Sequence, residues 1–420
     1  MCKGKKVLFF LLVLGISALS SALGAEDNIF YRGLRPMGMG GAFISVADDE
    51  NTRNWNPAGM MYLPGMNLSF QIQGRASDDV VSSVSDISNM IDAYDEINND
   101  TTDFWSNPKT NDFYEKYIKG WMDKKIVFNI DGGFDLVLPK ARKKVMTFGL
   151  GFYAKTKTNI WLNQTGLSAM GFPFSLIDDQ MLYNINLDFV PSFSGAYKFS
   201  SVVPTFVSGG KRDLSVGLTF KYIMRYKISN ESSPYNVKEL IDGKRADGTV
   251  IDLAKDAKNL VDHPGSGVGF DIGAITELTD YMRVGMVLQD VGTKITYDSA
   301  AIPADDIPMN VRIGTTFYPF KYLYPDSQRK NFDVIISADL DNLTGDAREN
   351  SDLMDKVHLG AEMKFSLFKN FLSLGLRGGT NQGFPTYGVT LHGLWILQLD
   401  YTAYGDEFAD YHNAAFSIIF

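Results

Sequence analysis

The chain has 420 residues and a single cysteine, Cys2, and its formal net charge is −9 at pH 7. This acidic balance argues against nucleic-acid binding, which rewards a dense basic surface. Beyond the N-terminus no segment has about 18 consecutive apolar residues, which excludes an ordinary helical membrane protein.

The first 25 residues have the pattern of a secretory signal peptide. Three lysines within residues 3–6 precede an apolar run over residues 7–16, and small residues lead up to Ala25. The run is too short to act as a membrane anchor. Cleavage before Ala25 or Glu26 would remove Cys2, so the exported chain cannot rely on disulfides and must be held by strand pairing or a large core.

A glycine-rich segment precedes the first two-faced strand. Clustered glycine permits close backbone approach, and Asn-Pro followed by Gly forces a turn, so this segment is compact and has little strand character. Its backbone must be satisfied inside something polar, and we predict that residues 26–64 plug a barrel lumen as a hatch. The residues that carry this prediction are Gly38, Gly40, Gly41, Asp48, Asp49, Asn56, Pro57, Ala58 and Gly59.

Beyond residue 64, apolar and polar residues alternate in one segment after another. In residues 357–367 every odd position is apolar and every even one is polar or small, so one face is apolar and the other polar. The two-faced segments are 66–73, 126–138, 145–155, 186–199, 213–227, 267–278, 281–291, 310–318, 332–340, 356–367, 371–377, 387–393, 397–404 and 414–420. They predict an all-β fold over residues 65–420, an antiparallel transmembrane β-barrel of about 14 strands with partly helical extracellular loops.

Charges of both signs fall on the polar faces of these segments, including Asp131, Lys221, Arg225, Glu362 and Asp400. Such a face must meet water or a polar plug. The alternative is a large soluble antiparallel protein, which would bury its apolar faces against a second sheet. The signal peptide and the C-terminal aromatic residue Phe420, through which the barrel assembly machinery would recognise the chain, favour the membrane barrel.

The connections alternate between short ones, such as 139–143 and 279–280, and long ones, such as 74–125, 156–185 and 229–266. An N-terminus in the periplasm places all the long ones outside. Helical spacing of apolar residues in the first and third long connections fits either packing on the barrel rim or an apolar cap over the pore mouth. The second is unusually apolar and forms a candidate capture loop with Trp161, Leu162, Phe172, Phe174 and Leu176.

The glycine-rich segment resembles the N-terminal hatch of the FadL family of outer-membrane transporters for long-chain fatty acids and other hydrophobic compounds. The shared pattern is matched by Ala47-Asp48-Asp49 and Asn56-Pro57-Ala58-Gly59, and it is also similar to the PorV-like and TraF-like barrel relatives, some of which are secretion accessories. The resemblance implies a hatch, a hydrophobic site beneath the loops, and lateral release of cargo through an inward kink in the third strand. In this chain Gly149 and Gly151 lie on the inward face of segment 145–155 and would permit a kink, although inward glycine also serves simple packing in barrels.

The four histidines show no metal-ligand spacing, and no HExxH motif or cysteine pair is present. We therefore expect no enzyme activity, metal or cofactor. The expected function is passive uptake of hydrophobic molecules by a monomer in the outer membrane of a diderm bacterium, in contact with its lipids. The alternatives are a secretion or assembly accessory that grips a protein partner with its loops, and a structural porin.

Overall fold

The computed structural model describes residues 33–77, 108–113, 127–141, 145–163, 180–204, 210–229, 264–299, 302–324, 331–343, 353–367, 371–405 and 410–420, with short pieces at 93, 96–97, 116, 235–236, 239, 244–245 and 247–250. The predicted signal peptide lies outside the described residues. So do three members of the predicted capture loop, Phe172, Phe174 and Leu176.

Fourteen long strands form one closed antiparallel barrel among the described residues. They are β1 (Asn67–Ser77), β2 (Val127–Val137), β3 (Met146–Asn163), β4 (Gln180–Pro204), β5 (Lys211–Ser229), β7 (Gly265–Thr279), β8 (Met282–Tyr297), β10 (Asn310–Phe317), β11 (Phe332–Leu340), β12 (Val357–Leu367), β13 (Leu372–Asn381), β14 (Phe384–Gly393), β15 (Leu397–Gly405) and β16 (Asp410–Ile419). Consecutive long strands pair, and the pairing of β1 with β16 and of β8 with β10 closes the ring. The short strands β6 (Tyr235–Asn236) and β9 (Asp305–Asp306) add to β4 and β8.

The outside of the barrel is apolar and its inside is polar. Along β12 the side chains of His358 and Glu362 are buried, whereas those of the residues that follow each of them, Leu359 and Met363, are exposed. The same alternation places Phe70 and Ile72 of β1 outside. The predicted fold class is therefore confirmed, because the period-2 pattern assigned the faces correctly.

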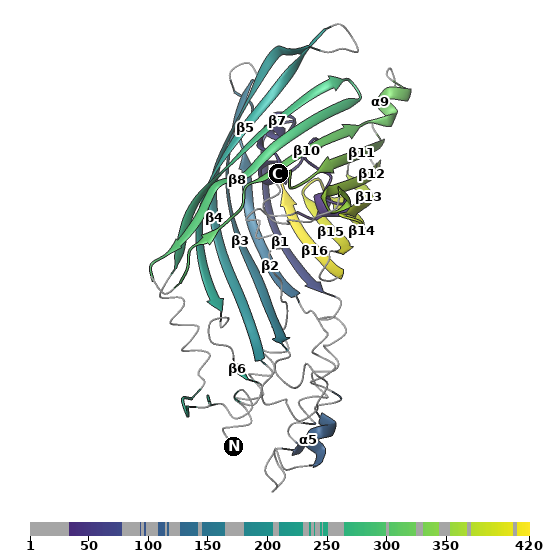
Figure 1. Cartoon of the computed structure of the whole chain (residues 1–420). Helices are drawn as coiled ribbons and strands as arrows, with labels where there is room; N and C mark the ends of the chain where they lie inside the picture. The colour runs from purple at the N-terminus through teal and green to yellow at the C-terminus, as the bar shows by residue number, and fades with distance from the viewer. Residues whose placement is uncertain are drawn as a thin grey trace.

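The barrel has walls of unequal height (Figure 1). We call β3, β4, β5, β7 and β8 the tall wall and β10 to β16 the low wall: β4 has 25 residues, whereas β10 has 8. The connections β2–β3, β4–β5, β7–β8, β10–β11, β12–β13 and β14–β15 all lie at one end, the short-turn end, and the others at the loop end.

The tall wall corrects one prediction. Residues 156–185 were expected to be a loop, but β3 continues to Asn163 and β4 begins at Gln180, with Trp161 paired to Leu182 and Leu162 to Met181. Alternating apolar and polar residues indicate a strand only where the two faces of that strand meet different surroundings. The hydrogen bonds between two paired strands do not depend on this difference and continue as far as the partner strand does. Trp161 and Leu162 are thus strand residues.

Residues 33–63, the N-terminal segment, contain the short helices α2 (Leu34–Gly38), α3 (Thr52–Trp55) and η1 (Pro57–Met61). α2 packs against β13, β14, β15 and β16, and η1 packs against β3, β4, β5 and β7, so the segment contacts the inward faces of both walls (Figure 1). The other described helices are α5 (Pro108–Phe113), in the first long connection, α9 (Pro319–Leu323) and η6 (Leu353–Lys356). None of the described helices has the length and apolarity that crossing a membrane requires.

Candidate functional site

Glycines in the barrel wall form the seat of the N-terminal segment. A Cβ on Gly285 of β8 would lie 2.8 Å from the carbonyl oxygen of Ile44, and a Cβ on Gly273 of β7 would lie 2.9 Å from Cδ of Pro57. Other inward glycines that meet the segment in this way are Gly149, Gly217, Gly314, Gly360, Gly379 and Gly388. The segment reaches the wall backbone because these positions have no side chain.

The predicted motif Asn56-Pro57-Ala58-Gly59 is the turn that ties the segment to β7 and β8. Asn56 Nδ2 donates to the carbonyl oxygens of Ile44 at 2.9 Å and Ala274 at 3.3 Å, and Asn56 Oδ1 accepts from the amide of Ala58 at 3.2 Å. Gly59 is packed so closely on Ala47 that a Cβ would overlap its backbone.

The predicted glycines at the start of the segment contact the low wall. Gly40 and Gly41 have positive φ of 64° and 80°, and the carbonyl oxygen of Gly40 lies 2.7 Å from Nδ1 of His358 on β12. Gly38 lies against Gly388 of β14. The structure therefore brings the predicted hatch residues together as one packed unit, with glycine where left-handed backbone requires it.

Arg35 binds both aspartates of the predicted Ala47-Asp48-Asp49 motif. Its guanidinium donates to Glu362 of β12 at 2.7 Å, to Asp48 at 2.7 Å and to Asp49 at 2.8 Å. Burial opposes charge on Asp48, but the Arg35 guanidinium prevails and holds the Asp48 pKa below its usual value. The two aspartates thus orient the arginine that ties the segment to the wall.

Glu50 is in a different environment from the two acids before it. It is buried and accepts from the side-chain amides of Gln398 at 3.1 Å and Asn51 at 3.3 Å. Burial, with the negative charges of Asp49 and Asp400 nearby, raises the pKa of Glu50 to about 8. The carboxyl group is therefore mainly protonated at neutral pH.

Arg53 occupies the space over the two glycines predicted as a lateral gate. Its Nε donates to Asp135 of β2 at 2.7 Å, and its two terminal nitrogens donate to Ser194 and Ser192 of β4, each at 3.0 Å. Between those strands, Gly149 and Gly151 of β3 are buried and a Cβ on either would collide with Arg53. β3 keeps one register with β4 along its whole length. The observed role of both glycines is room for Arg53, and the kink stays a prediction.

Sequence reasoning missed an inward apolar group on the tall wall. We call Tyr153, Val190, Ile223, Ile295 and Ile307 the apolar row; they form one buried cluster from β3, β4, β5, β8 and the residue after β9. Tyr153 pairs with Val190, and Ile223 and Ile295 both pair with Gly267, so the members lie at one level of the wall. The available signal was the alternation of faces along each strand. Tyr153 lies two residues after inward-facing Gly151, and Ile223 lies between inward-facing Lys221 and Arg225, so both side chains point inward.

Paired charges border the apolar row on both sides. Lys221 forms ion pairs with Asp290 and, at 2.7 Å, with Asp271. Arg225 holds Asp188 through two hydrogen bonds of 2.7 and 2.8 Å. Because each of these cations is paired with carboxylates, the row offers an apolar contact inside a lumen that is otherwise polar.

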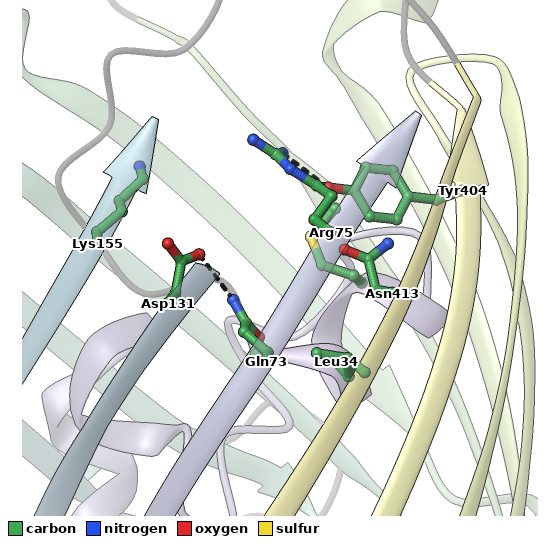
Figure 2. Close-up of a pocket in the computed structure, with 9 residues that line it drawn as sticks. Leu34, Gln73, Arg75, Asp131, Lys155, Tyr404 and Asn413 are labelled. Carbon is green, nitrogen blue, oxygen red and sulfur yellow. Dashed lines mark hydrogen bonds between the residues drawn. The ribbon is translucent and has the colours of Figure 1, made fainter. Parts of the chain in front are cut away.

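A cavity lies between the N-terminal segment and the strands β1, β2, β3, β15 and β16 (Figure 2). Leu34 and Met37 of the N-terminal segment line it, and Arg75 Nη1 donates to the Tyr404 hydroxyl at 3.0 Å. Lys155 belongs to the same lining and lies two residues beyond Tyr153 on β3. The remaining lining residues are Gly33, Gln73, Asp131 and Asn413. Among the described residues no cluster of three histidine, cysteine or acidic side chains could hold a metal.

A closed antiparallel barrel with apolar side chains outside and paired charges inside is a transmembrane β-barrel, because only lipid makes that exterior favourable. No family profile matches the sequence, and no curated protein matches it either.

Several solved structures match the fold over nearly the whole chain. The Ralstonia pickettii toluene transporter TbuX is 12% identical, with 94% of this chain and 98% of that chain covered and a TM-score of 0.45. The Pseudomonas putida toluene transporter TodX is 10% identical, with coverage of 96% and 98% and a TM-score of 0.44. A Pseudomonas aeruginosa FadL homologue is 11% identical, with coverage of 95% and 99% and a TM-score of 0.40. At such identities the function must be argued from this chain's own residues.

Proposed function

We propose that this protein is an outer-membrane channel for the passive uptake of hydrophobic molecules. The observation that carries the proposal is the apolar row, which lies inside a charged lumen next to the level of the N-terminal segment. An apolar surface there is of no use to small polar solutes, whereas burial of a hydrocarbon chain gains about 25 cal/mol per Å². Capture at the loop end would precede transfer to the row.

The cavity beside the row favours amphiphiles with an acidic head group, such as long-chain fatty acids. Its lining has two cationic side chains, Arg75 and Lys155, against one acidic side chain, Asp131. The hydrocarbon tail would extend along Tyr153 and Ile223. Charge-assisted hydrogen bonds to a carboxylate are stronger than neutral ones, so the head group would orient the cargo.

The N-terminal segment would act as the hatch, within the proposed boundaries 26–64. Its seat on wall glycines and the Arg35 and Arg53 contacts support a plug that closes the lumen until cargo shifts it. Release sideways past Gly149 and Gly151 belongs to this proposal, since displacement of Arg53 would empty the space above both glycines. Trp161 and Leu162 lie nearer the loop end of the same strand and fit an entry path.

Saturable binding of a fluorescent fatty-acid analogue to purified protein in detergent tests the proposal. The variant Ile223→Asn should weaken binding about tenfold, because the tail would lie against a polar group. The matched control is Val202→Asn, at an exposed position near the short-turn end of β4, which should bind as wild type. Equal binding by both variants, or no saturable binding by the wild type, contradicts the proposal. A stoichiometric protein partner retained at high salt would favour a secretion accessory instead.

A further inference from the structure

The inward charges of the barrel wall form sets whose net charge differs with their level in the barrel. Towards the loop end of β5, Arg225 forms ion pairs with Asp188 and Asp305. Lys227 also pairs with Asp305, so this set of four is neutral. Three other sets, at the level of the N-terminal segment, each carry one negative charge in excess.

The first set is a single carboxylate, Asp135 of β2, whose counter-charge comes from the N-terminal segment. The guanidinium of Arg53 donates to Asp135 at 2.7 Å, and within the described part of the chain Asp135 forms no ion pair with a wall residue. A shift of the segment that removes Arg53 therefore leaves this carboxylate without a partner of opposite charge.

The second set lies on the low wall, where one guanidinium faces two carboxylates. Arg312 of β10 lies 3.5 Å from Asp341, and Asp339 of β11 accepts from two backbone amides of the N-terminal segment at 2.7 and 2.9 Å. The other oxygen of Asp339, Oδ1, is buried and accepts no hydrogen bond among the described residues. His358 lies 3.4 Å from Asp341 and adds a positive charge only when it is protonated.

The third set borders the apolar row, where one ammonium group faces two carboxylates. Lys221 of β5 forms ion pairs with Asp271 of β7 and Asp290 of β8, and all three side chains are buried. Asp290 Oδ2 accepts no hydrogen bond from any residue that the structure describes. Both this set and the second therefore contain a buried carboxylate oxygen without a partner.

The three sets surround the N-terminal segment from different strands. Asp135 and Asp339 bind the segment directly. In the third set, Asp290 follows Gln289, whose side-chain amide donates to the carbonyl oxygen of Asn54 in the segment at 3.3 Å. The space that the segment fills is thus bordered by excess negative charge on β2, on β11 and between β5, β7 and β8.

We propose that these three sets form an acidic constriction, which makes the passage opened by a shift of the N-terminal segment selective for cations. Rings of acidic side chains select cations in pores, because they attract cations and repel anions at close range. The inference rests on the proposed movement of the segment and is independent of which hydrophobic molecule is carried.

The constriction would also sort the parts of the cargo. The cavity has the opposite balance, with Arg75 and Lys155 against Asp131 (Figure 2). An ionised carboxylate head group would be held there and repelled from the constriction, whereas neutral molecules would pass.

Reversal potentials in planar bilayers measure the selectivity. The protein carries Gly151→Ala, which should open the passage more often, and a tenfold gradient of KCl is applied at neutral pH. The permeability of K⁺ should exceed that of Cl⁻ about threefold or more. This ratio does not depend on how often the passage opens, so it reports the charge of the constriction and not the stability of the segment.

Two variants in the same background remove excess charge. Asp135→Asn should lower the permeability ratio towards one, and Asp339→Asn should do the same while it keeps an acceptor for the two amides. The matched control is Asp306→Asn, which removes a carboxylate that is 74% exposed in its pair with Lys294 and should leave the ratio unchanged.

Equal permeability of K⁺ and Cl⁻, or a preference for Cl⁻, overturns the constriction. A ratio that neither Asp135→Asn nor Asp339→Asn changes also overturns it. The same holds if the Gly151→Ala protein carries no current, because no passage then forms at this level. Loss of fatty-acid binding with an unchanged ratio would contradict the proposed cargo alone, so the two failures are distinguishable.

Discussion

Two buried arginines fix the N-terminal segment, and each does so through carboxylates on the wall. Arg35 binds Glu362 of the low wall, and Arg53 binds Asp135 next to the tall wall. Both guanidinium groups are nearly inaccessible to solvent, so their charges depend on these partners. At the residue scale, the position of the N-terminal segment is therefore fixed mainly by electrostatic contacts.

The variant Arg53→Met should loosen the segment without unfolding the barrel. Removing one partner of a fully buried pair costs about 3–5 kcal/mol. The cost here should be somewhat smaller, because the Asp135 side chain, left without its counter-charge, is 15% exposed. Hydrogen exchange of residues 43–56 should show this loss of protection. The control Lys294→Met breaks the exposed pair with Asp306 and should change protection by less than about 0.5 kcal/mol. Equal protection in the wild type and the Arg53 variant would argue against this role.

Glu50 should make the segment sensitive to pH. Its pKa is about 8 in the folded chain and about 4.5 when unfolded, so the folded form binds the proton more tightly. This stabilisation is fully present below pH 4.5 and is lost as pH rises towards 8. The negative groups that face it are Asp49 and Asp400, and Arg35 is the nearby cation.

Protection of the segment should therefore fall between about pH 6 and pH 8.5 in the wild type, after correction for intrinsic exchange rates. Glu50→Gln keeps the amide hydrogen bonds and removes the titration, so its protection should stay constant over that window. A wild-type segment with constant protection would show that Glu50 is charged throughout.

At the element scale, β3 contacts the N-terminal segment and contributes to the apolar row. In one strand, Gly149 and Gly151 accommodate Arg53, Tyr153 contributes to the row and Lys155 lines the cavity. A change in the position of Arg53 thus acts on the strand that also contacts the proposed cargo. Under the proposed function, this strand would connect occupancy of the apolar row to movement of the N-terminal segment.

Gly151→Ala should displace Arg53, because the new methyl group would overlap its guanidinium. Overpacking of this kind costs about 1–3 kcal/mol, and the plug should open more often. Ion conductance in planar bilayers should rise above that of the wild type. The control Gly74→Ala adds a methyl group in β1 where nothing lies within 4 Å and should leave conductance unchanged. Equal conductance in both variants would show that Arg53 does not keep the lumen closed.

At the scale of the whole molecule, the sequence predicted the barrel well, because alternation is strong wherever one face meets lipid and the other does not. β12 (Val357–Leu367) matches its prediction to within one residue. The ends of β3 and β4 could not be predicted, since both strands continue beyond the region of alternation. The apolar row was missed because an apolar residue such as Ile223 reads as lipid-facing unless its phase is followed from Lys221.

The contacts of the N-terminal segment with the barrel wall were predicted only in part. The motif residues from Gly38 to Gly59 indicated a compact segment inside something polar, and the structure packs them on the wall. Their partners, such as Glu362, were predicted only as inward charges. The pairing between inward charges and residues of the N-terminal segment depends on the strand register around the closed barrel. Local sequence patterns do not determine that register.

Photolabelling tests directly whether a hydrophobic molecule binds inside the lumen at the apolar row. A long-chain fatty acid with a photoreactive group near the end of its tail would be bound to the protein in outer membranes, irradiated, and its adducts mapped by mass spectrometry. Binding at the apolar row predicts saturable labelling of Tyr153, Ile223 or Ile295, which unlabelled fatty acid suppresses. Labelling confined to outward residues such as Leu218 and Phe220, without competition, would contradict it.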